Sequence, residues 1–395
     1  MPFLPITLVC ALLHAWIGWR IVPALATLPG WPATGWIFGT VLTASTLLIP
    51  LAFRLTRRAD KTAPVVLVVW LGLLLMGLFS SLFVLTLLRD ALLVLVWLSL
   101  WLFWLAGREP VSLDAVLSLS AAAVPVLGLA ATAWGFMSAR RTARIVRVDV
   151  PISGLPAALH GFTVAQLSDI HVGPTIGQAY LRRIVARVNT LGADMVAITG
   201  DLVDGRVADL AMHVAPLSEL SSRHGTFFVT GNHEYYSGVQ PWIDELRRLG
   251  MRVLLNQHVV LDHPSPDGGT GASVVIAGVS DFNAHHFDES HRSDPHAAIA
   301  GAPAHVHTRL LLAHQPRSAP EAASAGFHLQ LSGHTHGGQI WPWNHFVQYQ
   351  QPFTAGLDRL RGLWVYTHSG TGYWGPPKRF GVPSEITCVR LVMAD

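Results

Sequence analysis

Residues 162–171 of the chain read FTVAQLSDIH, an apolar run that ends in polar residues. The same order returns at 195–204, MVAITGDLVD, and at 226–234, TFFVTGNHE. Short apolar runs bounded by glycine and polar residues are typical of buried strands. In open α/β sheets, functional side chains gather where strand ends converge on one edge. These stretches therefore predict an α/β fold with a polar site at the ends of its strands.

Two further apolar runs end in the same way, because 309–313 precedes His314 and 328–331 precedes SGHTH at 332–336. Other strands are expected at 273–279, 363–367 and 386–391. Helical stretches are expected at 177–190, 207–222, 240–249 and 317–325. This alternation is typical of an α/β domain with a buried sheet.

The composition divides the 395-residue chain into two parts. Overall 51% of residues are hydrophobic and only 13% are charged, well below the usual quarter or so for a soluble protein. Residues 1–150 carry 11 Lys or Arg and 5 Asp or Glu, whereas 151–395 carry 16 and 19. We therefore expect a membrane region over 1–147 and the α/β domain over 148–395. The basic residues of the first part lie between apolar runs, where lipid headgroups would meet them, so no nucleic-acid partner is expected.

Four stretches are long and apolar enough to cross a bilayer, which takes about 20 helical residues. They lie at 4–27, 34–53, 63–88 and 115–137. The apolar run 91–106 is shorter and is separated from the third span by Arg89 and Asp90. It could be a short span, a half-buried helix or an interfacial helix.

The basic residues around the spans predict which side of the membrane the α/β domain occupies. Arg54, Arg57, Arg58 and Lys61 form one cluster, and a second cluster follows the last span at 140–147. Both should be cytoplasmic by the positive-inside rule, which four spans satisfy and five do not. We therefore expect an inner-membrane protein with four spans and a cytoplasmic α/β domain.

The polar residues at the strand ends have the chemistry of a metal centre. Asp169 and His171 are two residues apart, as are His334 and His336, and alternate residues of an extended chain point the same way. Imidazole, carboxylate and amide ligands suit Mn, Fe or Zn, whereas the two cysteines of the chain offer no thiolate cluster. The ligands are too many for one ion, so a pair of divalent ions that share a carboxylate is expected.

In their order, DxH, GDxxD, GNHE, a single His and GHTH resemble the calcineurin-like metallophosphoesterases. The flanking text SDIHVGPTIG, LSGHTHGGQ and GTGYWGPPKR is similar to the bacterial membrane-associated branch of that family. The resemblance extends over about 155–392 and, more loosely, over the multi-span N-terminal part. It implies an αββα sandwich with two mixed β-sheets. One departure is His368, where related sequences often have an arginine.

The resemblance also implies a role for each residue of the motifs. One metal would be bound by Asp169, His171 and His336. The other would be bound by Asn232, His314 and His334, and Asp201 would bridge the two. His233 would remain unligated above the substrate, and Asp204 would orient its ring.

The expected activity is hydrolysis of a phosphoester. The membrane region favours a phosphodiester or a lipid-linked ester as the substrate. A hydroxide that bridges the metals would attack phosphorus, and His233 would protonate the leaving group as general acid. The alternative is a membrane sensor or scaffold that binds a phosphorylated ligand without turnover. A transporter is disfavoured, because Arg20, Arg89 and Asp90 form no obvious pattern of paired charges. The oligomeric state stays open.

Six aromatic residues follow the last motif: Trp341, Trp343, Tyr349, Phe353, Tyr373 and Trp374. Packing inside the domain is the favoured interpretation. The alternative is contact with a lipidic substrate at the membrane surface.

Overall fold

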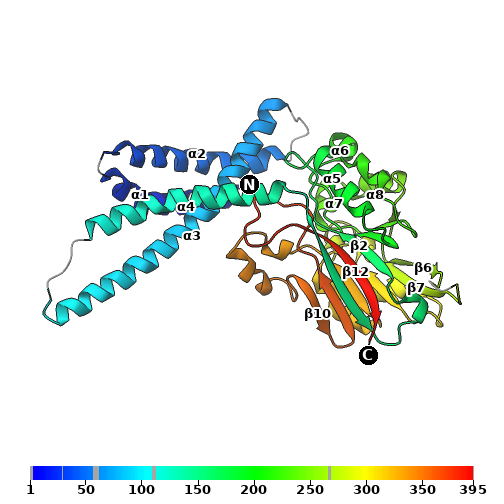
Figure 1. The fold of residues 1–395 in the computed structure, drawn as a ribbon. Helices are drawn as coiled ribbons and strands as arrows, with labels where there is room; N and C mark the ends of the chain where they lie inside the picture. Colours follow the sequence, from blue (N-terminus) through cyan, green and yellow to red (C-terminus); the bar gives the residue numbers. More distant parts are fainter. Residues whose placement is uncertain (1–2, 29, 57–61, 109–112, 266–267, 395) are drawn as a thin grey trace. The chain divides into compact units, whose positions relative to one another are not determined.

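The computed structural model describes residues 3–28, 30–56, 62–108, 113–265 and 268–394 (Figure 1). The chain forms two compact units. The first contains Met1–Met137 together with Gly375–Lys378, and the second contains Ser138–Trp374 together with Arg379–Asp395. Each unit is described by itself below.

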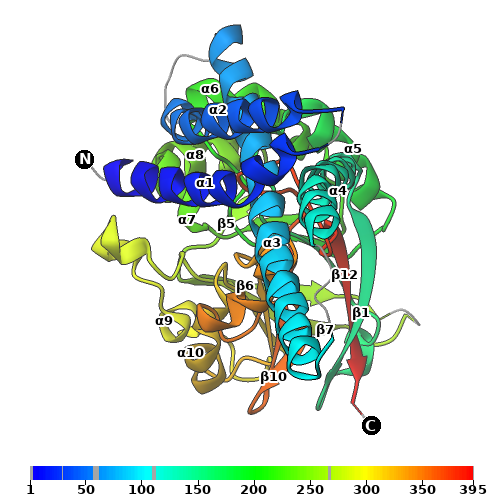
Figure 2. The same cartoon turned by 90° about the vertical axis from the view of Figure 1, so that its left-hand side faces the viewer.

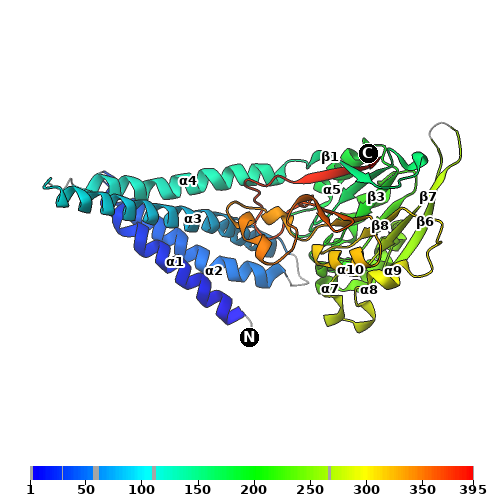
Figure 3. The same cartoon turned by 90° about the horizontal axis from the view of Figure 1, so that it is seen from below.

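In the residues that the structure describes, the first unit has four helices, all long and apolar enough to cross a membrane. They are α1 (Phe3–Ala26), α2 (Ala33–Thr56), α3 (Ala63–Leu105) and α4 (Asp114–Arg140), the last of which ends just inside the second unit. Helices α1 and α2 pack along each other (Figure 3). The prediction of four apolar N-terminal helices is confirmed. Three of the basic residues used to predict the topology, Arg57, Arg58 and Lys61, lie outside the described residues.

The apolar run 91–106 is not a separate element, because α3 continues through it without a break. With 43 residues and a rise of about 1.5 Å per residue, α3 is roughly twice as long as the ~30 Å hydrocarbon core of a bilayer. Arg89 and Asp90, which seemed to separate two segments, lie within the helix and make polar contacts from it. They therefore do not end the third span.

Three charged side chains of the helices, Arg20, Arg89 and Asp90, have polar partners inside the first unit. The guanidinium of Arg20 donates to both carboxylate oxygens of Asp90, at 2.8 and 2.9 Å. Arg89 is buried and donates to the Ser120 hydroxyl and the Leu117 carbonyl. The expectation that these charges form no paired pattern is wrong. A charge in an apolar region is costly unless it has a partner. Here the partners come from neighbouring helices, so the contacts join α1, α3 and α4.

Residues Gly375–Lys378 belong to the helical unit although they lie far along the chain. The ammonium of Lys378 is buried and donates to the Gly77 carbonyl at 2.8 Å and to the Ser81 hydroxyl at 2.6 Å. Experiments on this protein are therefore best made with the full chain, because removal of the helices would leave the Lys378 ammonium without these acceptors.

The second unit contains two six-stranded mixed sheets. The first has the order β1-β12-β2-β3-β4-β5, with bounds Arg144–Ile152, Glu385–Met393, Thr163–Leu167, Met195–Ile198, Thr226–Phe228 and Arg252–Val253. The second has the order β10-β11-β9-β8-β7-β6, with bounds Gly356–Leu360, Leu363–Thr367, Leu329–Ser332, Arg309–Leu312, Ala272–Gly278 and Gln257–His263. In the first sheet β2, β3, β4 and β5 run parallel, while β12 pairs antiparallel with β2 and parallel with β1. In the second sheet β11, β9, β8 and β7 run parallel, and β10 and β6 pair antiparallel at the two edges.

The sheets pack face to face, and helices cover their outer faces. The apolar core between the sheets holds Val164 and Phe227 from the first and Val274 and Leu310 from the second. Helices α5 (Gln178–Asn189), α6 (Val207–Val214) and α8 (Val239–Arg248) cover the first sheet through a second core. Helices α9 (Pro295–Ile299) and α10 (Ala319–Ser324), which lie next to each other in Figure 2, cover the second sheet. This confirms the expected αββα sandwich with two mixed sheets.

Some elements differ from the expectation. Strand β1 begins at Arg144, so it crosses the position 147/148 at which the sequence suggests a domain boundary. It pairs in parallel with β12, a partner more than 200 residues away by residue number, with Arg147 opposite Cys388. The helix expected over 207–222 ends at Val214, because the ring of Pro216 cannot continue an α-helix and a 3₁₀ turn follows.

Candidate metal centre

The seven predicted ligands follow strands of both sheets. Asp169 and His171 come after β2, Asp201 after β3, and Asn232 opens α7 (Asn232–Ser237) after β4. From the second sheet, His314 comes after β8, and His334 and His336 come after β9. The carboxyl ends of these parallel strands meet at one edge of the sandwich, so segments far apart in sequence deliver their side chains to one place.

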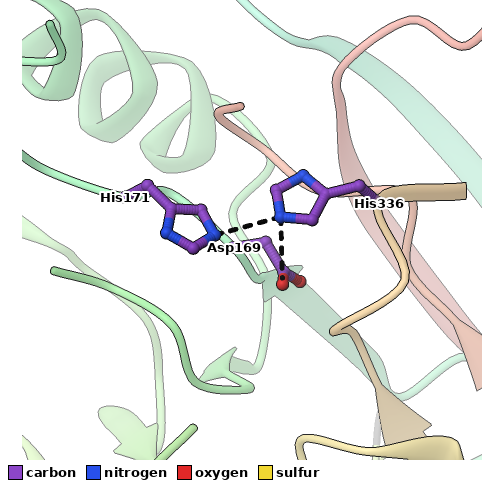
Figure 4. A group of neighbouring side chains, drawn as sticks. All are labelled: Asp169, His171 and His336. Carbon is purple, nitrogen blue, oxygen red and sulfur yellow. Dashed lines mark hydrogen bonds and ion pairs between the residues drawn. The ribbon is translucent and has the colours of Figure 1, made fainter. Parts of the chain in front are cut away.

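One group of possible ligands consists of Asp169, His171 and His336 (Figure 4). Their ligand atoms lie within 4.8 Å of one another. Nε2 of His336 is 3.0 Å from Nε2 of His171 and 3.5 Å from the Asp169 carboxylate. All three side chains are buried.

A second group consists of Asp201, His314 and His334. Nε2 of His314 lies 3.1 Å from the Asp201 carboxylate and 3.2 Å from Nδ1 of His334. Asp201 also lies within 4.8 Å of the ligand atoms of His171 and His233, in a third group. Asp201 therefore belongs to the second group and also lies close to His171 of the first group.

The side chains in these groups fit divalent cations. Nδ1 of His171 lies 2.9 Å from the Asp204 carboxylate, and Nδ1 of His314 lies 2.7 Å from the Thr199 carbonyl. Since a carboxylate and a carbonyl only accept, each Nδ1 carries a proton, which leaves Nε2 as the nitrogen that can bind a metal once it is deprotonated. The side-chain oxygen of Asn232 is buried without a hydrogen-bond partner. Such an acceptor is costly unless a cation or a donor meets it.

The backbone is strained at five of the seven predicted ligands. Asp169, His171, Asp201, His334 and His336 all have positive φ angles, between 51° and 71°. Residues other than glycine seldom adopt this left-handed region, and strain of this kind is typical of functional sites. The expected extended chain through Asp169 and His171 and through His334 and His336 is therefore wrong. Left-handed turns, and not strand alternation, direct these pairs of side chains.

Two glycines allow the segments that carry the ligands to approach closely. A Cβ atom at Gly231 would collide with the carboxylate and backbone of Asp201. A Cβ at Gly333 would collide with the Ser168 hydroxyl and with the Asp169 carboxylate. Any larger residue at these positions would displace a predicted ligand.

His233 and Asp204 lie beside the groups of possible ligands. Nδ1 of His233 donates to the Asp204 carboxylate at 2.6 Å, and the backbone N–H of His233 donates to the Asp201 carboxylate at 2.8 Å. Nε2 of His233 lies 3.9 Å from Asp201. The same oxygen of Asp204 also accepts from His171, so one carboxylate orients both imidazole rings.

The charges of the site shift several pKa values. Burial lowers the pKa of His233, but the carboxylates of Asp201 and Asp204 outweigh it and raise this pKa to about 9. Burial would raise the pKa of Asp201, but the charges of His314 and His233 hold it well below its usual range. Burial, with the charge of His314 adding to it, lowers the pKa of His334 to about 3. His334 is therefore neutral at pH 7, the form in which imidazole binds a metal.

Glu234 supports the site but was assigned no role from the sequence. Its buried carboxylate accepts the backbone N–H groups of Asp201, Leu202, Val203 and Gly231, at 2.7–3.3 Å. These contacts tie the segment after β3 to the start of α7. The only signal in the sequence is its place in GNHE, next to His233.

Arg379 is a second supporting residue that the sequence did not reveal. Its guanidinium is buried, donates to the carbonyls of Ser369 and Gly372, and lies 3.1 Å from Nδ1 of His336. His368 is also buried, and its Nδ1 accepts the backbone N–H of Gly370. The signal for Arg379 is its place in the stretch WGPPKR.

Comparisons with known proteins identify the family of this chain. Residues 162–338 match the family model described as calcineurin-like phosphoesterase. A Bos taurus protein named transmembrane protein with metallophosphoesterase domain is 39% identical over 301 residues, which cover 74% of this chain and 67% of that protein. A Campylobacter jejuni protein named as an uncharacterized metallophosphoesterase is 36% identical over 256 residues, which cover 64% of each chain.

A Helicobacter pylori protein, also named as an uncharacterized metallophosphoesterase, is 40% identical over 230 residues, 57% of this chain and 58% of that protein. The matched regions thus span 58% to 67% of these relatives' own length. The matched part of the chain includes every predicted ligand and both His233 and Asp204. The chain therefore belongs to the calcineurin-like phosphoesterase family, a class of metal-dependent hydrolases of phosphoric esters.

Proposed function

We propose that this protein is a membrane-anchored hydrolase of phosphoesters that works with two divalent ions, Mn, Fe or Zn. Asp169, His171 and His336 would hold one ion, and Asn232, His314 and His334 the other, with Asp201 between them. The observation that supports this most strongly is the position of Asp201, whose carboxylate is within reach of both groups of possible ligands. When bound, the two ions would lower the pKa of a water molecule and offset the negative charge that develops on the phosphate oxygens.

His233 is the group that would protonate the leaving oxygen. Asp204 accepts its Nδ1–H at 2.6 Å, so the exchangeable proton for the substrate is on Nε2. The carboxylates of Asp201 and Asp204 raise the pKa of His233 to about 9, against the effect of burial. His233 is therefore protonated at neutral pH, as a general acid must be.

The helical part of the chain would anchor the enzyme and favour a phosphodiester or a lipid-linked substrate. A tether raises the local concentration of a substrate that lies in the same membrane. Arg54 in the last turn of α2 and the basic residues at 140–147 support a cytoplasmic position for the α/β part by the positive-inside rule. The inner membrane is the expected location.

The first test follows metal-dependent turnover in the full chain. We expect chelated protein to regain hydrolysis of ethyl p-nitrophenyl phosphate when Mn²⁺ is added. Asp201→Asn should lower kcat by on the order of 100-fold, because it removes a charge that faces both groups of ligands. A folded protein that binds Mn²⁺, Fe²⁺ or Zn²⁺ but hydrolyses neither this diester nor p-nitrophenyl phosphate would instead indicate a sensor of phosphorylated ligands.

The second test concerns metal binding without turnover. Gly333→Ala should lower the affinity for Mn²⁺ by about 10–100-fold, because the new methyl group displaces the Asp169 carboxylate. Gly362→Ala is the matched control, since a Cβ there meets no atom within 4 Å. Bound metal is measured by mass spectrometry of the dialysed protein. Equal affinities in the two variants would argue against Asp169 as a ligand.

The third test uses leaving groups of different basicity. His233→Ala should lower kcat by about 10²–10⁴-fold for an alkyl phosphoester, whose alkoxide must be protonated as it leaves. The loss should be much smaller for a p-nitrophenyl ester, because nitrophenolate leaves without a proton. Rates are followed by release of the alcohol and of nitrophenolate. The same loss for both substrates would show that His233 does not act as the acid.

The fourth test concerns pH. Activity on the alkyl ester needs protonated His233, so it should fall as pH rises through the pKa of His233. Because the Asp204 carboxylate raises that pKa, Asp204→Asn should move the alkaline fall of kcat to lower pH, by roughly 1–3 units. Metal content is measured in parallel, since Asp204 also contacts His171. An unchanged alkaline limb at full metal content would contradict the role of Asp204.

A further inference from the structure

The segment after His336 exposes several aromatic side chains. No Asp, Glu, Lys or Arg occurs between Glu321 and Asp358. Within this uncharged stretch, residues 341–349 form what we call the aromatic loop. Its exposed fractions are 44% for Trp341, 38% for Trp343, 55% for Phe346 and 80% for Tyr349. Of the six aromatics singled out in the sequence, Tyr373 is buried as packing predicts, whereas Tyr349 is the most exposed.

The loop has a defined shape that aligns its rings. Two short 3₁₀ turns, Trp343–His345 and Val347–Tyr349, follow each other. In 3₁₀ turns, residues three apart lie on the same side. Accordingly, the rings of Trp343 and Phe346 are 6.0 Å apart, and those of Phe346 and Tyr349 are 6.4 Å apart. The result is a row of aromatic rings on one side of the loop.

The loop is attached to the metal centre. A Cβ at Gly338, two residues after His336, would collide with the backbone of Asn344, so the loop packs directly on the last metal motif. Beyond the loop, the Thr354 carbonyl accepts a hydrogen bond from the Thr335 hydroxyl at 2.6 Å. The position of the aromatic loop is thus fixed relative to His334 and His336.

The loop also adjoins the side of the site on which His233 lies. Gln339, directly before the loop, exchanges two hydrogen bonds of 2.9 Å with the backbone N–H and carbonyl of Trp374. The half-exposed ring of Trp374 lies 6.0 Å from the His233 ring. Exposed aromatic side chains therefore lie both on the aromatic loop and beside the residue that would protonate the leaving group.

The chemistry of the loop fits a bilayer surface. Tryptophan and tyrosine are favoured at the level of the lipid headgroups, where an apolar ring and a polar edge are both satisfied. A segment without charged side chains loses little hydration when it enters that region. A membrane is also within reach, because only residues 141–143 separate the apolar helix α4 from β1.

We propose that the aromatic loop lies in the headgroup layer of the membrane and that the metal centre acts on a phosphoester carried by a lipid. The substrate assignment rests on the proposed hydrolase function, whereas the position of the loop does not. A lipid phosphate would reach the site from the bilayer surface along the loop, and its apolar part would stay in the membrane.

Spin labels on the full chain test the position of the loop. Cys10 and Cys388 are replaced by alanine, and a nitroxide is attached at Phe346→Cys in vesicles of dioleoylphosphatidylcholine. We expect this label to be more accessible to oxygen than to a water-soluble nickel chelate. A label at Met212→Cys, an exposed apolar position on α6, should show the opposite order. A label at Phe346→Cys that is open to the nickel chelate, or shielded from both reagents as between two protein copies, would overturn the proposal.

A pair of substrates with the same leaving group tests the lipid assignment. Hexadecyl p-nitrophenyl phosphate in these vesicles should be hydrolysed with a kcat/KM at least about 10-fold above that of ethyl p-nitrophenyl phosphate, since the membrane concentrates it near the site. Phe346→Glu with Tyr349→Glu should remove this advantage and leave the rate on the ethyl ester unchanged. Met212→Glu is the control variant and should change neither rate.

The outcomes separate the two proposals. Equal kcat/KM for the hexadecyl and ethyl esters in the unmodified protein, or an advantage that survives the two glutamates, would overturn the lipid assignment while the hydrolase function stands. Failure to hydrolyse either ester with metal bound would instead contradict the hydrolase function. In that case the spin-label result still decides whether the loop contacts the membrane.

Discussion

The carboxylate of Asp169 joins the two sheets at the place where the site is built. Both of its oxygens lie 3.0 Å from the backbone N–H of His334, so the end of β2 in one sheet is tied to the segment after β9 in the other. The buried side-chain amide of Gln166 in β2 also donates to the Ser332 carbonyl in β9 at 2.9 Å, which forms a second contact between the two sheets. Because each sheet supplies part of the predicted ligand set, a slip of one sheet along the other would separate the ligands. The remaining geometry of the site depends on this junction.

The sequence was sufficient to predict candidate ligands that the structure brings together, but not the residues that position them. Asp201 and His314 each follow an apolar run, and this pattern is visible without a structure. Glu234 and Arg379 act through contacts with backbone groups, and such contacts depend on how distant segments meet. The left-handed conformation at Asp169 was likewise hidden, because side-chain identity favours that region only for glycine and, more weakly, asparagine or aspartate.

For the fold, too, features that depend on neighbouring residues could be predicted, whereas contacts between distant segments could not. The helices of the first unit were predictable from length and hydrophobicity, which are local properties. The pairing of β1 with β12 was not, because Arg144 and Arg147 make the start of β1 resemble the basic segment that follows a membrane span. Continuity of α3 through Arg89 and Asp90 was also missed, since it depends on partners from α1 and α4 that accept or balance these charges.

The membership of Gly375–Lys378 in the helical unit has a consequence for how such a protein can evolve. The chain enters that unit at two separate places, so its two parts cannot be exchanged as modules by a single recombination. An α/β part joined to a different anchor would keep Lys378 without the Gly77 and Ser81 acceptors that now surround its ammonium. We therefore expect anchor and catalytic part to be inherited together, and substitutions near Gly77 to be accompanied by changes at Lys378.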